Sequence, residues 1–170
     1  YLSLGTIIGG IIVIIWLCIL IYKWNVKTET RVLSLVVAYA LPIGFFISIG
    51  GAVLTLYYSD YLGVLPCGLC WFQRVFLYSQ VFLYGLAWYK RDTNIFSYTL
   101  VLSVVGFIVA VYHSYLQMGY SELLPCPVVA STIDCAKPTF IEFAFVTFQF
   151  MAVVLIANLI LLSVTARGSN

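Results

Sequence analysis

The sequence predicts an all-α integral membrane protein, because its composition argues against folding in water and its apolar residues form runs of membrane-crossing length. Of its 170 residues, 64% are hydrophobic and only 8% are charged, whereas soluble domains carry about 25% charged residues. Eight Lys and Arg residues and six Asp and Glu residues are too few to cover a soluble surface. The composition therefore argues against a soluble enzyme and against a nucleic-acid-binding protein, and it places the chain in a lipid bilayer.

Five apolar runs are each long enough to cross a bilayer as a helix, which takes about 20 residues. They cover residues 2–22, 32–57, 67–89, 95–118 and 139–165. The segments between them are short and more polar, and no stretch is left for a soluble domain. We therefore expect a bundle of five transmembrane helices.

The positions of Lys and Arg predict how this bundle is oriented, because short loops rich in these residues stay in the cytoplasm. The loop after the second run and the loop before the fifth hold only Lys137. The other two loops and the C-terminal tail hold Lys23, Lys27, Arg31, Lys90, Arg91 and Arg167. This asymmetry places the N-terminus outside and the C-terminus inside.

The first run is predicted to be a membrane helix rather than a signal peptide, because its positive charges follow the apolar residues and no small-residue cleavage site is visible. Gly5 and Gly9 have the G-x-x-x-G spacing that lets two transmembrane helices approach closely. The pair is consistent with a homodimer or a helix partner on this face, and equally with small residues occurring by chance. In the second run, Pro42 with Gly44, Gly50 and Gly51 predicts a kinked or closely packed helix.

Four of the five cysteines lie on the predicted outer side, while Cys18 lies within the first run and is expected to pack there. Cys67 and Cys70 begin the third run, and Cys126 and Cys135 lie in the loop before the fifth. Disulfides persist outside the cytoplasm, so two structural bridges are one interpretation. However, a C-x-x-C bridge closes too small a loop to stabilise the fold much, and this spacing is typical of redox-active thiols.

The residues around the C-x-x-C favour the redox interpretation. Pro66 is expected to end the preceding loop and to place both cysteines in the first turn of a helix, where free backbone N–H groups stabilise a thiolate. Arg74 follows Cys70 at i+4 and lies about 10 Å below Cys67, given a rise of about 1.5 Å per residue. An arginine within an apolar run costs about 2.5–3.5 kcal/mol on insertion scales, so Arg74 is a functional candidate. The alternative is an anchor that reaches up to the interface.

His113 is the only histidine and lies near the outer end of the fourth run. At about 7–8 Å from that end it is expected in the same layer as Arg74. Glu142 is expected in the fifth helix at a similar depth, close enough to pair with either residue. The alternative for His113 is an interior residue whose hydrogen bonds are satisfied.

The cysteine spacing does not fit either of two common metal-containing sites. Haem attachment needs a histidine directly after C-x-x-C, but Trp71 follows Cys70. A four-cysteine zinc site needs two closely spaced pairs, whereas eight residues separate Cys126 from Cys135, and zinc would leave Arg74 unexplained. No metal site is therefore expected.

Three motifs together resemble the DsbB/BdbC family of membrane thiol:quinone oxidoreductases. They are PCGLCWFQR with its C-x-x-C-x3-R pattern, YHSYLQ with His113 thirteen residues before Cys126, and DCA with Cys135. The resemblance covers about residues 32–165 and implies a four-helix transmembrane bundle of DsbB type. It leaves residues 1–31 as an additional N-terminal transmembrane helix with a cytoplasmic loop, and residues 166–170 as a cytoplasmic tail.

The resemblance implies a disulfide generator in the bacterial cytoplasmic membrane, with its redox loops on the extracytoplasmic side. Such a protein reoxidises a DsbA-like thioredoxin-fold dithiol protein and passes the electrons to ubiquinone or menaquinone. By analogy, Cys126 forms the mixed disulfide with the partner and Cys135 passes electrons to Cys67. Cys70 then faces the quinone as a thiolate, and the quinone-binding residues are Arg74 and His113.

Two departures and two alternatives accompany the resemblance. The eight-residue loop between Cys126 and Cys135 resembles shorter BdbC-like members, and the first helix, with Cys18, has no counterpart in the family core. One alternative is a reductase of the vitamin K epoxide reductase type, in which the C-x-x-C is expected in a later helix. The other is a non-catalytic membrane subunit whose disulfides stiffen the outer loops.

Overall fold

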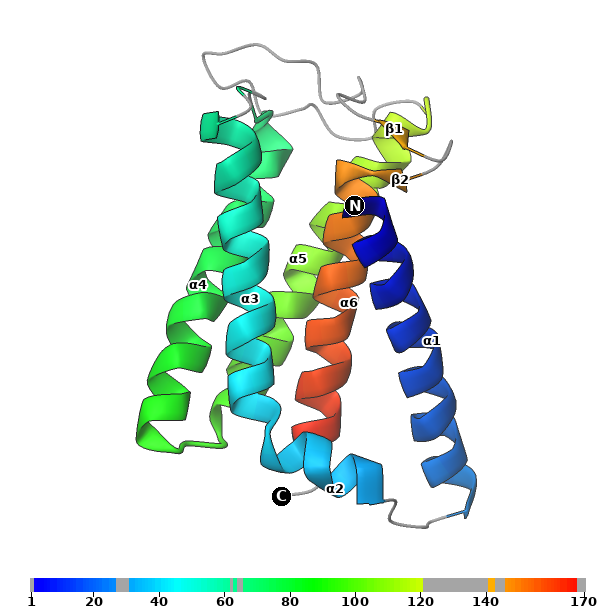
Figure 1. Cartoon of the computed structure of the whole chain (residues 1–170), viewed down its shortest axis with the longest axis vertical. Helices are drawn as coiled ribbons and strands as arrows, with labels where there is room; N and C mark the ends of the chain where they lie inside the picture. The colour runs from blue at the N-terminus through cyan, green and yellow to red at the C-terminus, as the bar shows by residue number, and fades with distance from the viewer. Residues whose placement is uncertain are drawn as a thin grey trace.

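The computed structural model of the chain describes residues 2–26, 31–61, 63, 66–120, 141–142 and 146–167. In these residues the protein is a bundle of helices with one two-stranded hairpin at one end (Figure 1). Three helical segments are long and apolar enough to cross a membrane, namely Ala40–Tyr61, Ile95–Gln117 and Gln149–Arg167. The helical membrane fold expected from the composition is thus confirmed, with three spans established by length and composition.

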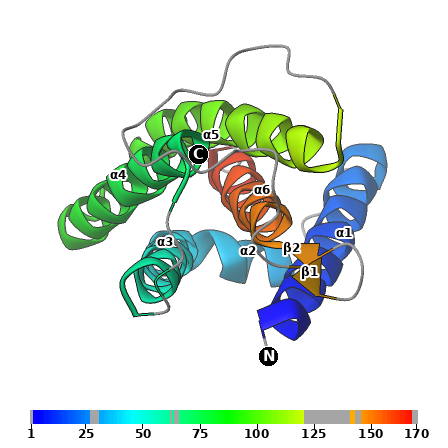
Figure 2. The same ribbon diagram turned by 90° about the horizontal axis from the view of Figure 1, so that it is seen from above.

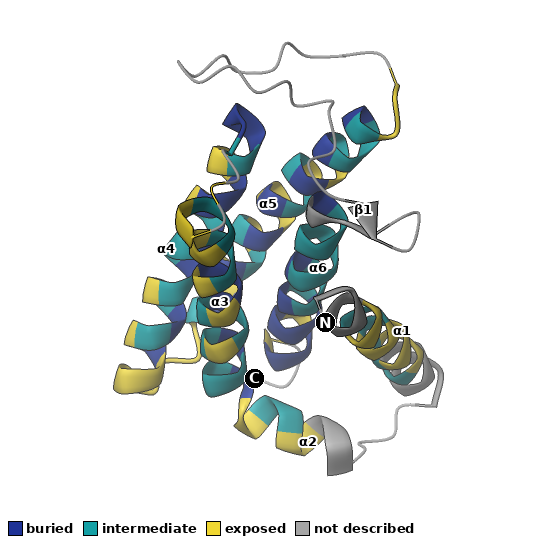
Figure 3. Cartoon of the chain, turned by 45° about the horizontal axis from the view of Figure 1, so that its top comes forward, coloured by how far each residue is buried: buried dark blue, intermediate teal, exposed yellow. Residues whose placement is uncertain are grey.

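Helix α6 (Phe148–Arg167) lies in the middle of the bundle and packs against α1 (Leu2–Val26), α3 (Ala40–Leu56) and α5 (Ile95–Gln117) (Figure 2). Its described residues are mostly buried or half-buried, whereas the outer face of α1 is exposed (Figure 3). This contrast is the pattern expected of a bundle whose outer helices face lipid.

The extra helix α1 packs on α6 through small and polar residues. A Cβ at Gly9 would lie 3.1 Å from Val154, so the missing side chain allows the close approach. Asn158 Nδ2 lies 3.5 Å from Gly9 O and donates to it, and Trp16 Nε1 donates to Thr165 Oγ1 at 3.0 Å. Gly9 therefore contacts a helix of the same chain, while a homodimer through Gly5 and Gly9 stays a prediction.

The expectation that Cys18 packs inside the bundle was wrong. It is a free thiol exposed on α1, beside the exposed side chains of Ile14, Ile15 and Leu17. An apolar thiol is compatible with a lipid-facing position because a free cysteine behaves as a small hydrophobic residue.

The second predicted run is broken into α2 (Arg31–Ala38) and α3 at Tyr39, which has φ −105° and ψ 14°. Pro42 explains the position of the break. Proline has no N–H to donate to the carbonyl of Ala38, four residues earlier, and its ring collides with that carbonyl in a continuous helix. The predicted kink is therefore confirmed, one turn before the proline, and α2 leaves the line of α3 (Figure 1).

The interior of the bundle combines close packing with buried hydroxyl groups. Tyr84 of α4 (Gly68–Lys90) is fully buried against Gly44 of α3. Its hydroxyl lies 2.9 Å from Ser163 Oγ, which lies 3.2 Å from Thr99 Oγ1. These bonds join α4, α5 and α6, and interhelical hydrogen bonds of this kind contribute about 0.6 kcal/mol each in a membrane.

Helix α4 is not among the three apolar spans, although its 23 residues are enough to cross a bilayer. The buried polar residues Gln73, Arg74 and Gln80 lower its hydropathy. These residues face the bundle, so the polarity of α4 reflects its interior contacts.

The fifth predicted run was wrong at its start. Strand β1 (Ile141–Glu142) pairs antiparallel with β2 (Val146–Thr147), and α6 begins only at Phe148. The segment from residue 139 to residue 148 is rich in Phe, Val, Ile and Thr, and these aromatic and β-branched residues favour strands. Glu142 is therefore on a strand rather than in a helix, and its side chain is outside the described residues.

Candidate functional site

The start of α4 holds two thiols. Cys67 is the N-cap residue, with extended backbone (φ −75°, ψ 173°), and Cys70 lies in the first helical turn, as predicted. In the described part of the chain no side-chain cap hydrogen bond is made at this helix end, where the first N–H groups can stabilise a negative sulfur. The two Sγ atoms lie 3.1 Å apart as free thiols. Only a small side-chain rotation separates this arrangement from a disulfide, whose bond is about 2.05 Å long.

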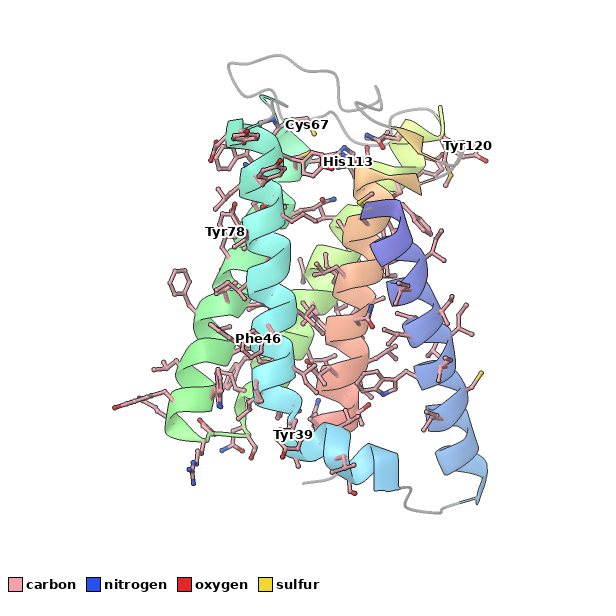
Figure 4. The ribbon with its side chains drawn as sticks, viewed as in Figure 1. Tyr39, Phe46, Cys67, Tyr78, His113 and Tyr120 are labelled. Atoms are coloured by element: carbon pink, nitrogen blue, oxygen red, sulfur yellow. The ribbon has the colours of Figure 1, made fainter. Side chains whose placement is uncertain are left out.

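His113 lies directly beside this pair. It is fully buried in the last part of α5, and its Nε2 is 3.5 Å from Cys67 Sγ. Figure 4 shows Cys67 and His113 at the same end of the bundle, opposite Tyr39. An imidazole at this distance can take the proton of the thiol and stabilise the thiolate.

Two glutamines that sequence reasoning missed complete the cluster. Gln73 Nε2 lies 3.4 Å from His113 Nδ1, and Gln149 Nε2 donates to Cys70 Sγ at 3.7 Å. They are 9% and 4% exposed, respectively. The signal for both was an amide inside an apolar run, since buried polar groups need partners. The cluster of Cys67, Cys70, Gln73, His113 and Gln149, called the dithiol cluster below, thus draws on α4, α5 and α6.

Arg74 makes its contacts on another side of α4. Its Nη2 donates to the backbone oxygen of Thr55 at 3.0 Å, and its guanidinium lies 5.3 Å from the ring centroid of Trp71. Thr55 is next to the junction of α3 with the π-helix η1 (Tyr57–Tyr61), where the helical hydrogen-bond register changes. Arg74 is 7% exposed. Within the described part of the chain it is therefore held by α3 and Trp71 rather than by the dithiol cluster.

Cys126 and Cys135 lie outside the described residues. Their pairing and their approach to Cys67 stay predictions, as does any pairing of Glu142 with Arg74 or His113.

The donor atoms of Cys67, Cys70 and His113 all lie within 4.8 Å of one another, so these three residues could hold a metal ion. The same arrangement also suits thiol–disulfide exchange, which needs a thiolate next to a second sulfur. Both possibilities depend on the same pair of reduced sulfurs.

A helical bundle with candidate membrane-spanning segments and a dithiol beside a buried histidine defines a class, that of helical membrane proteins with a paired-thiol centre. Comparison with known proteins identifies a family within this class. Residues 37–166 match the family described as "Disulfide bond formation protein DsbB". The chain belongs to the DsbB family.

Relatives in two bacterial groups carry corresponding names. The chain is 35% identical over 113 residues to the "SPbeta prophage-derived disulfide bond formation protein B" of Bacillus subtilis, which covers 66% of this chain and 75% of that protein. It is 29% identical over 119 residues to the "Disulfide bond formation protein C" of the same organism, covering 68% and 83%. A "Probable disulfide formation protein" of Chlamydia trachomatis is 41% identical over 80 residues, covering 47% and 59%. No solved structure matches the chain.

Family membership implies a role in disulfide bond formation at a membrane, together with a partner that exchanges thiols and disulfides. The resemblance expected from the motifs is thereby confirmed.

Proposed function

We propose that this protein is a membrane thiol:quinone oxidoreductase, which reoxidises a DsbA-like extracytoplasmic dithiol protein and passes the electrons to ubiquinone or menaquinone. The observation that carries the proposal is the geometry of the free dithiol. Its sulfurs lie 3.1 Å apart at an uncapped helix N-terminus, and a histidine nitrogen lies 3.5 Å from Cys67 Sγ. Family membership supports it.

In this proposal the dithiol cluster alternates between a disulfide and two thiols. The outer pair, Cys126 and Cys135, is oxidised by Cys67–Cys70, which is reduced to two thiols. The Cys70 thiol then loses its proton and gives up two electrons as a thiolate, while His113 takes the proton of Cys67 and the two sulfurs join in the Cys67–Cys70 disulfide. Two thiols become one disulfide, and two electrons and two protons leave.

The surroundings of Cys70 fit an apolar electron acceptor. Trp71 and Phe72 are 47% and 53% exposed, so an apolar surface lies next to Cys70 in sequence. Arg74, stacked on Trp71, offers guanidinium N–H groups that can donate to a carbonyl oxygen. A membrane quinone supplies the acceptor for two electrons and two protons, and Arg74 and His113 are the residues proposed to position it.

The proposed topology has five spans, with α1 and α4 crossing the membrane beside the three apolar segments. The N-terminus is outside, and the dithiol cluster lies at the extracytoplasmic side of the bacterial cytoplasmic membrane. The start of α4 then lies at the membrane surface, where the outer pair is proposed to reach Cys67, while exposed apolar residues of the same helix face lipid.

The test is quinone reduction by a reduced dithiol partner. Cys70→Ser removes the proposed electron donor and is expected to abolish turnover, whereas Cys18→Ser removes an exposed thiol of α1 and is expected to leave turnover unchanged. Turnover of Cys70→Ser at the unsubstituted rate would refute the catalytic assignment.

A further inference from the structure

The dithiol cluster has the donor set of a site for a thiophilic metal ion. We propose that the reduced Cys67–Cys70 pair and His113 bind one divalent cation, such as Zn²⁺ or Cd²⁺, and that the bound cation blocks re-formation of the disulfide. The blocking role rests on the proposed function, because it requires the pair to cycle between dithiol and disulfide.

The distances between the donors suit a tetrahedral ion. With metal–sulfur and metal–nitrogen bonds of about 2.3 and 2.0–2.1 Å, neighbouring ligand atoms lie about 3.6–3.8 Å apart. Cys67 Sγ is 3.5 Å from His113 Nε2 and 3.1 Å from Cys70 Sγ, and all three donor atoms lie within 4.8 Å of one another. Side-chain adjustments of about an ångström therefore complete a two-sulfur, one-nitrogen set, which leaves the fourth position for water.

Gln73 provides a second, independent feature of a metal site. A metal-binding histidine usually hydrogen-bonds through its other ring nitrogen, which fixes the orientation of the ring. The Gln73 amide lies against His113 Nδ1, with its Nε2 at 3.4 Å. Turned over about its terminal bond, the amide presents its oxygen to an Nδ1–H donor, which leaves His113 Nε2 unprotonated and facing the sulfurs. The side chain of His113 is fully buried, so the ring is also held by packing.

Charge balance favours binding in the reduced state. Two thiolates and one divalent cation form a neutral complex, which a buried site accommodates better than a net charge. Binding releases the two thiol protons and moves no electrons. The disulfide state offers no thiolate, so it is not expected to bind the cation.

This site differs from a four-cysteine zinc site, for which the spacing of Cys126 and Cys135 is unsuitable. The structure instead places His113, 46 residues after Cys67, where it can serve as the third ligand.

The first experiment measures Cd²⁺ binding to the full-length protein in detergent. Cys18, Cys126 and Cys135 are replaced by Ser, so that only one pair of thiols remains, and thiolate-to-metal absorption in the ultraviolet is followed during titration. We expect one Cd²⁺ per chain, release of two protons, and loss of binding after oxidation of the pair. No absorption band, or one Cd²⁺ for every two chains, would overturn the proposal.

Substitutions of two glutamines on the same helix separate a site effect from a general packing effect. Gln73→Leu removes the group that orients His113 and is expected to weaken Cd²⁺ binding about 10–100-fold, while Gln73→Glu keeps a hydrogen-bonding oxygen and is expected to restore it. The control is Gln80→Leu, because Gln80 is also buried and bonds to Ser103 two turns further along the helix. An equal loss in Gln80→Leu would contradict the role of Gln73.

A second measurement keeps this inference apart from the proposed function. In metal-free wild-type protein, quinone reduction tests the function alone. Stoichiometric Zn²⁺ is then expected to stop turnover, and a chelator to restore it. Turnover that persists with Zn²⁺ present overturns the blocking role and leaves the function standing. Cd²⁺ bound one to one by a protein without quinone turnover overturns the function and still supports the site.

Discussion

Gly44 of α3 is predicted to be a position where one added methyl group destabilises the whole bundle. A Cβ at this position would lie 2.6 Å from Cε1 of Tyr84 and 2.8 Å from Cδ1 and Cζ of the same ring. The nearest of these is about 0.8 Å closer than the 3.4 Å at which ordinary van der Waals contact begins. Tyr84 is fully buried and its hydroxyl is bonded to Ser163, so the ring cannot move aside without breaking that bond.

The expected change in the free energy of unfolding combines two destabilising terms with one stabilising term. Overpacking a core costs about 1–3 kcal/mol, and loss of a buried hydrogen bond costs about 0.5–1.5 kcal/mol. Replacing a helical glycine by alanine also stabilises by about 0.5–1 kcal/mol. Gly50 of the same helix measures this last term separately, because it is exposed and a Cβ there meets no atom within 4 Å. We therefore expect Gly44→Ala to be about 1.5–4.5 kcal/mol less stable than Gly50→Ala.

The assay is the free energy of unfolding of each variant by reversible denaturation in mixed micelles. Tyr84→Leu offers an internal check, since a smaller side chain makes room for the methyl group and should reduce the cost of Gly44→Ala. If Gly44→Ala and Gly50→Ala differ by less than about 0.5 kcal/mol, or if Tyr84→Leu leaves the cost unchanged, the packing argument is refuted.

Three further predictions concern the site and the extra helix. Arg74→Ala is expected to raise the apparent quinone KM. Trp71→Leu removes only the ring beside Arg74 and is expected to raise the same KM about two- to thirtyfold. An unaltered KM in both variants would assign Arg74 to membrane anchoring. Thr165→Val, which removes the hydrogen bond from Trp16, is expected to cost about 0.6 kcal/mol in unfolding experiments, and a loss above about 2 kcal/mol would contradict this. In thiol trapping, the four thiols of the two pairs are expected to be oxidised by quinone and reduced by the partner; permanently oxidised pairs would indicate structural bridges.

The ends of the helices were predictable where strong signals mark them. Residues 67–89 and 95–118 were predicted, and α4 and α5 run over Gly68–Lys90 and Ile95–Gln117. Charged residues and Gly119 mark these boundaries. The late start of α6 was missed because hydropathy does not distinguish an apolar strand from an apolar helix.

Depth along a helix was predictable from the sequence, but direction around it was not. A helix turns by about 100° per residue, so neighbouring residues face different partners. Gln73 contacts His113 of α5, while Arg74, the next residue, contacts Thr55 of α3. Which helix lies on which side of α4 depends on the packing of the whole bundle, and no local pattern specifies it.

The place of α6 has a consequence for the order in which the protein matures in the membrane. Among the described helices α6 comes last in sequence, yet it packs against α1, α3 and α5. Trp16 and Thr165, whose side chains are hydrogen bonded, are 149 positions apart in sequence. Until α6 is inserted, Tyr84 and Thr99 lack Ser163, and Cys70 lacks Gln149. Insertion of this helix therefore completes the polar interior: Thr99 keeps its bonds to Ile95 O and Phe96 O without it, but the Tyr84 hydroxyl gains Ser163 only when α6 arrives.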